Sequence, residues 1–155
     1  MKARSVVNSI ILIFFFSYFV IGTHIVDNYS VTPDEELHRI NGFISLKYIF
    51  SIFNIYEGYL LEFNNIPHLY DDWRKTYGVI FDLPFAVYET FYKPSLEEIF
   101  VLRHYINFLI FFISTIYFYK LIKSIFKDKI LAVLSVLILV STPRIFSHSF
   151  YNSKD

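Results

Sequence analysis

The first long segment of the chain carries no formal charge over a length that matches a lipid bilayer. Residues 5–26 contain no Asp, Glu, Lys or Arg and consist mostly of Val, Ile, Leu and Phe. At about 1.5 Å per residue, such a helix crosses a hydrocarbon core of about 30 Å. A secretory signal peptide is the alternative, because Lys2 and Arg4 resemble its basic start. The apolar run is longer than a signal peptide needs, and no small-x-small cleavage site follows it. We therefore predict an uncleaved transmembrane helix over about residues 6–26.

The composition agrees with a membrane protein, since 55% of the 155 residues are hydrophobic and 21% are aromatic. Two further apolar segments predict spans over about residues 99–119 and 130–146. The uncharged part of the third span stops at Pro143, so Arg144 would have to reach the membrane interface. The absence of cysteine excludes disulfides, thiolate metal sites and a cysteine nucleophile.

The distribution of charge predicts how the chain is oriented. The segment "KLIKSIFKDK", residues 120–129, has four Lys and one Asp, and the N-terminus carries Lys2 and Arg4. By the positive-inside rule both face the cytoplasm. Residues 27–98 then form a large outer loop, with twelve acidic and five basic side chains (12 − 5, a net charge of −7). Residues 147–155 begin a second outer loop. The expected location is a bacterial inner (cytoplasmic) membrane.

The outer loop has its own helical patterns. "DEELHRINGFISLKYIF" places apolar and polar side chains on different sides of a helix: Leu37, Ile40, Ile44 and Tyr48 on one, and Asp34, His38, Asn41 and Ser45 on the other. "VIFDLPFAVYETFY", residues 79–92, predicts a second interfacial or re-entrant helix, and "NNIPHLYDDWRKTYG" between them predicts a loop. The expected fold is an all-α integral membrane protein with about three transmembrane helices and interfacial amphipathic helices in the first outer loop.

The stretch "SVTPDEELHRING", residues 30–42, follows closely behind the first span. A purely structural interpretation is that this stretch begins a helix. Thr32 is a suitable N-cap, Pro33 suits the first turn, and Glu35 completes the capping-box pattern T-x-x-E. Its position allows a second interpretation. A carboxylate beside the outer membrane surface can meet a substrate whose reactive group lies at the level of the lipid headgroups.

An Asp-Glu pair at the start of an outer-loop helix resembles the membrane glycosyltransferases of the GT-C superfamily. These include the protein O-mannosyltransferases of family 39 and the aminoarabinose transferases that modify lipid A. "YGVIFDLPFAVYE" (77–89) is similar to the first outer loop of that group, and "STPRIFSHSFYNSKD" (141–155) looks like its second outer loop. The resemblance covers essentially the whole chain and predicts a partial GT-C fold.

The resemblance implies a polyprenyl-phosphate-linked sugar as donor and inverting transfer to an acceptor hydroxyl on the outer face. Asp34 matches the general base, Glu35 its supporting neighbour, and Asp155 the acidic residue of the second outer loop. Cations are expected beside the phosphate leaving group. The candidates for phosphate or substrate binding are Lys154, Arg144, Arg103 and, one turn after Asp34, His38.

Each of these candidates also has a structural interpretation. Lys154 would be solvated, Arg144 would be an interfacial anchor, and Arg103 would snorkel from the span end. No metal site is predicted around His38, because no second well-spaced ligand completes it; a divalent cation stays open since some GT-C enzymes use one. The "DDWRK" run at 71–75 favours a solvated loop, and no pattern for nucleic-acid binding is present.

GT-C enzymes usually have many more spans than this chain provides. We therefore expect residues 1–155 to be the N-terminal portion of a larger enzyme, truncated or split, and inactive alone. The expected partners are the bilayer, the lipid-linked donor and the remaining spans. A small non-catalytic membrane subunit whose acidic outer loop binds a partner is the alternative function. A channel or transporter element using Arg103 and Asp82 ranks last.

Overall fold

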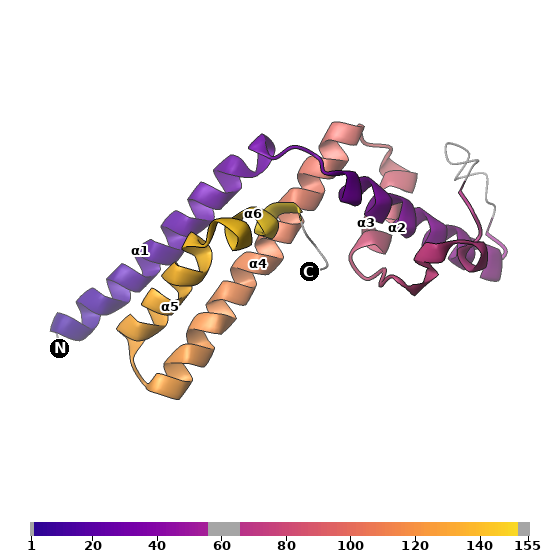
Figure 1. Cartoon of the computed structure of the whole chain (residues 1–155). Coiled ribbons are helices and arrows are strands. Elements are labelled where there is room, and N and C mark those ends of the chain that lie inside the picture. Colours follow the sequence, from indigo (N-terminus) through magenta and orange to yellow (C-terminus); the bar gives the residue numbers. More distant parts are fainter. Residues whose placement is uncertain (1, 56–65, 152–155) are drawn as a thin grey trace. The chain divides into compact units, whose positions relative to one another are not determined.

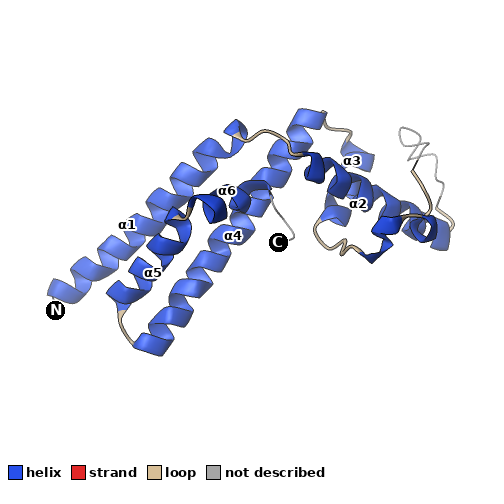
Figure 2. Cartoon of the chain, viewed as in Figure 1, coloured by secondary structure: helices blue, strands red, loops and turns tan. Residues whose placement is uncertain are grey.

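The computed structural model describes residues 2–55 and 66–151, and within these ranges every regular element is helical (Figure 2). The elements form two compact units, which are named here the span unit, Met1–Ser30 with Val101–Asp155, and the loop unit, Val31–Phe100. The elements in chain order are α1 (Lys2–Ile25), η1 (Val26–Asn28), α2 (Pro33–Ile52), η3 (Leu69–Asp71), η4 (Trp73–Thr76), α3 (Asp82–Tyr92), α4 (Leu96–Phe126), α5 (Lys129–Ser141) and α6 (Pro143–Tyr151).

Two helical segments are long and apolar enough to span a membrane. They are Val6–Asn28 and Leu96–Phe126, candidate spans by length and composition, and they cover the first two predicted spans, although α4 extends beyond the predicted 99–119 at both ends. At its start the Glu98 carboxylate accepts hydrogen bonds from the backbone N–H and hydroxyl of Ser95, at 2.7 and 2.9 Å. This second capping box was not predicted, although its S-x-x-E pattern is present in the sequence.

The third predicted span, residues 130–146, is covered by a broken helix. The helix α5 ends at Ser141, α6 begins at Pro143, and the two are bent by 73°. Thr142 between them is extended, with φ −72° and ψ 113°. A proline disfavours helical geometry in the residue before it, which explains the break. The described residues therefore contain two candidate spans, or three if the bent pair crosses as one.

Aromatic side chains pack α1, α4 and α6 together in the span unit, where α1, α4 and α5 run alongside one another (Figure 1). Phe108 of α4 and Phe150 of α6 are completely buried and stack at 5.2 Å between ring centroids. Gly22 of α1 faces this stack, since a Cβ added there would lie 1.9 Å from a ring carbon of Phe108. A small residue at this position lets the helix approach the ring closely, as is common between membrane helices.

The loop unit is built on the packing of α2 against α3. Gly42 of α2 lies so close to α3 that an added Cβ would be 2.6 Å from the backbone oxygen of Asp82 and 3.2 Å from the Cβ of Ala86. Buried apolar residues of α2, including Phe43 and Ile44, form the core beside this contact. The structure confirms helices in both predicted regions of the outer loop, and it packs them against each other.

We expect Gly42→Ala to lower the free energy of unfolding of the loop unit by about 1–3 kcal/mol, the usual cost of overpacking. The contact is with backbone, so relief requires the two helices to separate. Hydrogen exchange of α2 and α3 amides in lipid nanodiscs measures the change. Gly78→Ala is the matched control, because nothing lies within 4 Å of a Cβ at Gly78. Equal protection of the two variants would contradict the close α2–α3 packing.

Candidate functional site

The start of α2 holds the acidic cluster of the outer loop. Thr32 is extended, with φ −91° and ψ 153°, and Pro33 opens the helix. The Glu35 carboxylate accepts hydrogen bonds from the Thr32 backbone N–H at 2.8 Å and from the Thr32 hydroxyl at 3.0 Å. Glu35 is only 3% exposed. The predicted capping box is confirmed. Within the Asp-Glu pair, the Glu35 carboxylate is therefore the one that caps the helix.

Asp34, the other member of the pair, is exposed. It makes no hydrogen bond or ion pair with the other described residues, and its acidic neighbour Glu36 is exposed as well. The N-terminus of a helix stabilises negative charge, so this turn suits a carboxylate. The cap thus fixes the backbone on which Asp34 stands while leaving the Asp34 side chain open to a ligand.

His38 follows one turn later on α2 and is half-buried. Its ring centroid lies 6.3 Å from that of Tyr77, at the end of η4. Within residues 2–55 and 66–151, no group of three or more Asp, Glu or His side chains is arranged to hold a metal ion. Asp34, Glu35 and His38 all lie at the start of α2, and Asp34 is the exposed carboxylate among them.

The remaining predicted site residues belong to the span unit or lie outside the described ranges. Arg103 of α4 is buried, at 3% exposure, beside the buried His104. Arg144 is the second residue of α6 and is exposed. Lys154 and Asp155 lie outside the described residues. Asp34, Glu35 and His38 are thus neighbours on the first turns of α2. The functional role of every one of these residues stays a prediction.

The structure contains an ion pair between α2 and α3 that the sequence did not predict. The Arg39 guanidinium lies 2.7 Å from Oε2 of Glu89 through both Nε and Nη2, and its carbon lies 5.4 Å from the centroid of the Phe43 ring. The two side chains are 13% and 6% exposed. The sequence signal was weak, because it consists of one basic and one acidic residue on two separate amphipathic segments.

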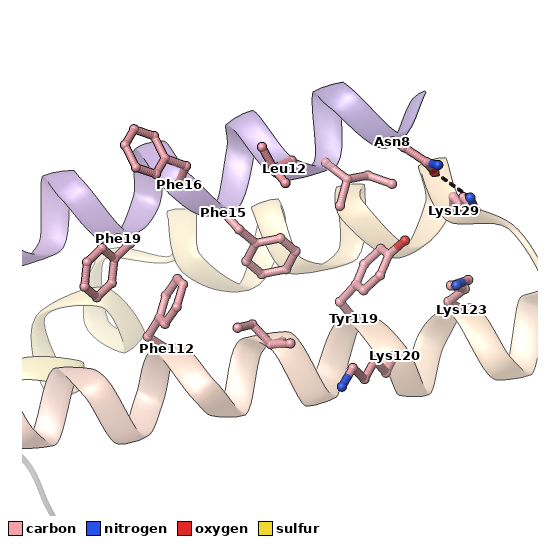
Figure 3. Close-up of a pocket in the computed structure, with 12 residues that line it drawn as sticks. Asn8, Leu12, Phe15, Phe16, Phe19, Phe112, Tyr119, Lys120, Lys123 and Lys129 are labelled. Carbon is pink, nitrogen blue, oxygen red and sulfur yellow. Dashed lines mark hydrogen bonds between the residues drawn. The ribbon is translucent and has the colours of Figure 1, made fainter. Parts of the chain in front are cut away.

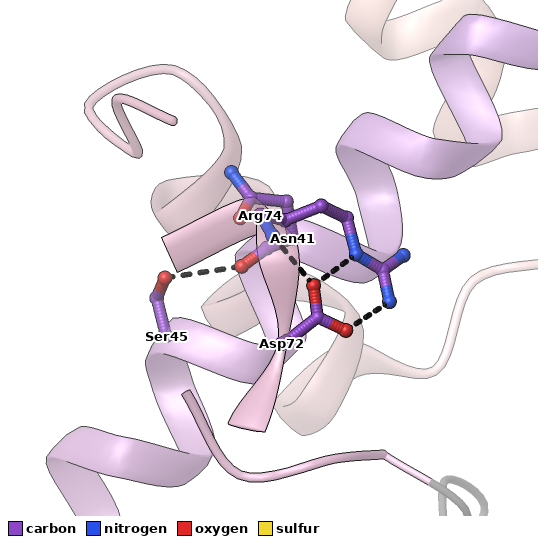
Figure 4. A network of polar contacts seen from close by, with 4 residues as sticks. All are labelled: Asn41, Ser45, Asp72 and Arg74. Carbon is purple, nitrogen blue, oxygen red and sulfur yellow. Dashed lines mark hydrogen bonds and ion pairs between the residues drawn. The ribbon is translucent and has the colours of Figure 1, made fainter. Parts of the chain in front are cut away.

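The predicted solvated loop at 71–75 contains a second, local ion pair. Asp72 is buried, and its carboxylate accepts hydrogen bonds from the backbone and side chain of Arg74, at 2.6–2.8 Å (Figure 4). The Arg74 side chain holds the pKa of the Asp72 carboxyl below its ordinary value. The Asp72–Arg74 pair therefore stabilises the fold at a pH above the ordinary carboxyl pKa. This stabilisation is lost as the pH falls through the lowered pKa of Asp72. The pair joins Asp72, the N-cap of η4, to Arg74 within the same short helix.

Two members of the predicted polar stripe are buried. Asn41 is 1% exposed, and its backbone oxygen accepts a hydrogen bond from the Ser45 hydroxyl at 3.0 Å (Figure 4). Neither atom of its side-chain amide has a hydrogen-bond partner in the described part of the chain. The polar stripe of α2 therefore does not lie wholly on the surface, because α2 is covered on more than one side.

Comparison with known proteins does not assign the chain to a family. No protein-family model, no curated protein and no solved structure matches the chain.

Proposed function

We propose that the chain forms the first outer loop and adjoining spans of a GT-C-like membrane glycosyltransferase. The enzyme transfers a sugar from a polyprenyl-phosphate-linked donor to an acceptor hydroxyl on the outer face of the membrane. Further spans, in the same polypeptide or in a partner, complete the site. The excess of lysine at 120–129 and of acidic residues at 27–98 supports an orientation with α2 outside.

The observation that carries the proposal is the division of roles within the Asp-Glu pair. Glu35 is buried and its carboxylate is bound to Thr32, whereas Asp34 is exposed on the same turn. The hydrogen-bonded cap consists of Thr32 and Glu35, so it does not use the Asp34 side chain. The resemblance assigns the base to Asp34, and the structure leaves that side chain open. Glu35 then acts as a positioning residue that fixes the turn.

The resemblance implies the following chemistry. The Asp34 carboxylate accepts the proton of the acceptor hydroxyl as its oxygen attacks the anomeric carbon of the donor. The bond from that carbon to the phosphate oxygen breaks, and the polyprenyl phosphate leaves with the electron pair. Attack from the face opposite the phosphate inverts the anomeric carbon. Arg103, Arg144 and Lys154 are the proposed cations for the leaving phosphate.

A non-catalytic subunit is the second candidate, and one observation favours it. Tyr70, Trp73 and Tyr77 are 67%, 63% and 44% exposed on the loop unit. Exposed tyrosine and tryptophan are enriched at protein–protein contacts. In that case the acidic turn would serve only to begin α2.

The experiment that tests the proposal measures sugar transfer by membranes of the source cells, with Asp34→Asn introduced into the otherwise intact gene. Donors are polyprenyl phosphates carrying mannose, glucose, galactose or aminoarabinose, and the product is the labelled acceptor. Loss of transfer at a normal protein level supports the enzyme. Unchanged transfer with every donor supports the subunit instead.

A further inference from the structure

The span unit contains a groove that the proposed chemistry does not use. It has a volume of about 650 Å³ and runs between α1 and α4 (Figure 3). Most of its wall is aromatic and aliphatic, with Phe15 and Phe19 from α1 and Phe112 from α4. The volume is within the range of about 300–1,000 Å³ that is usual for bound small molecules.

The length of the groove matches one leaflet of a bilayer. Its lining runs from Asn8 to Phe19 on α1 (19 − 8 = 11 residues) and from Phe112 to Lys123 on α4 (123 − 112 = 11 residues). At about 1.5 Å per residue this is about 16 Å, close to half of a hydrocarbon core of about 30 Å. A packed transmembrane helix would need a groove over the full thickness, so the length favours an acyl chain.

One end of the groove is cationic. Tyr119, Lys120 and Lys123 of α4 and Lys129 of α5 line it there, and the amine of Lys120 points away from those of the other two lysines in Figure 3. The Lys129 amine donates a hydrogen bond to Oδ1 of Asn8 at 2.6 Å, which ties α5 to α1 at this end. An ammonium group has three N–H donors, so Lys129 can bind an anion while keeping Asn8.

We propose that this groove binds an anionic phospholipid, with one acyl chain against the aromatic wall and the headgroup phosphate between Lys123 and Lys129. A basic pocket at the end of membrane helices attracts anionic headgroups, and the aromatic wall supplies the apolar contact. The lipid would fasten α1, α4 and α5 together at the end that carries residues 120–129. This inference is independent of the proposed transferase.

The test uses the full chain purified in a neutral detergent. Native mass spectrometry measures the lipid retained from equal amounts of phosphatidylglycerol and phosphatidylcholine with identical chains. We expect preferential retention of phosphatidylglycerol, weakened about tenfold or more in Lys123→Gln/Lys129→Gln. Lys127→Gln is the matched control, because it removes the same charge from the same loop but does not line the groove. Phosphatidylglycerol with a diazirine in its acyl chain should cross-link to residues 11–19 and 112–119.

Four outcomes would overturn the proposal. Equal retention of the two lipids would remove the headgroup preference. An equal loss in Lys127→Gln would reduce the effect to general surface charge. Binding of glycerol 3-phosphate as tightly as the lipid would show a phosphate site without a role for the groove. A dimer in native mass spectrometry, cross-linked through residues 11–19, would show that a second copy occupies the groove.

Discussion

Replacing Asp34 with asparagine is expected to lower sugar transfer by about 10²–10⁴-fold, the usual contribution of a positioned general base. Asparagine has nearly the same size as aspartate but cannot accept the proton of the acceptor hydroxyl. The cap of α2 is formed by Thr32 and Glu35, so the fold should stay intact. The measurement is the initial rate of transfer in membranes of the source cells, normalised to the amount of protein.

The matched control is Glu36→Gln, which removes one negative charge from the same exposed turn. We expect it to retain transfer, because Glu36 has no assigned role in the chemistry. Asp34→Glu should retain part of the rate, since it keeps a carboxylate in a shifted position. If both Asp34→Asn and Glu36→Gln cause the same small loss, the turn acts only through its charge and the base lies elsewhere.

Replacing Arg39 with methionine is expected to lower the free energy of unfolding of the loop unit by about 3 kcal/mol, because a buried carboxylate loses its partner. Glu89 is 6% exposed, and one of its oxygens, Oε1, has no hydrogen-bond partner in the described residues even with Arg39 in place. Hydrogen exchange of the α2 and α3 amides, or chemical denaturation followed by circular dichroism, measures the loss.

The double variant Arg39→Met/Glu89→Met separates pairing from packing. Replacing a whole buried ion pair with apolar side chains is often neutral or stabilising, so we expect stability close to that of the unchanged chain. Lys75→Met, an exposed change, should stay within about 0.5 kcal/mol. An Arg39→Met variant as stable as Lys75→Met would show that the pair contributes nothing to the α2–α3 contact.

Local signals account for most of what could be predicted about the fold. The start of α2 at Pro33 follows from the capping box, which depends only on neighbouring residues. The first span follows from an uncharged run of bilayer length. The break before Pro143 has an equally local cause, but hydrophobicity continues through it, and a measure of apolar length alone conceals the bend.

Tertiary contacts limit what could be predicted about the site. The sequence predicts the acidic turn, but it does not show that Glu35 is buried and Asp34 exposed, because the burial of one carboxylate depends on tertiary packing. Arg39 and Glu89 are fifty residues apart in sequence, and only the packing of α2 on α3 joins them. Asn41 has a polar position in the helical pattern but is buried by its neighbours.

Labelling at position 34 tests the placement of the acidic turn most directly. The chain has no cysteine, so Asp34→Cys and Lys127→Cys each introduce a single reactive site. A membrane-impermeant maleimide added to intact cells should modify the cysteine at position 34, and should modify the one at position 127 only after the cells are opened. Labelling at 127 but not at 34 in intact cells, or no labelling at 34 in either case, would contradict a catalytic carboxylate at the outer membrane surface.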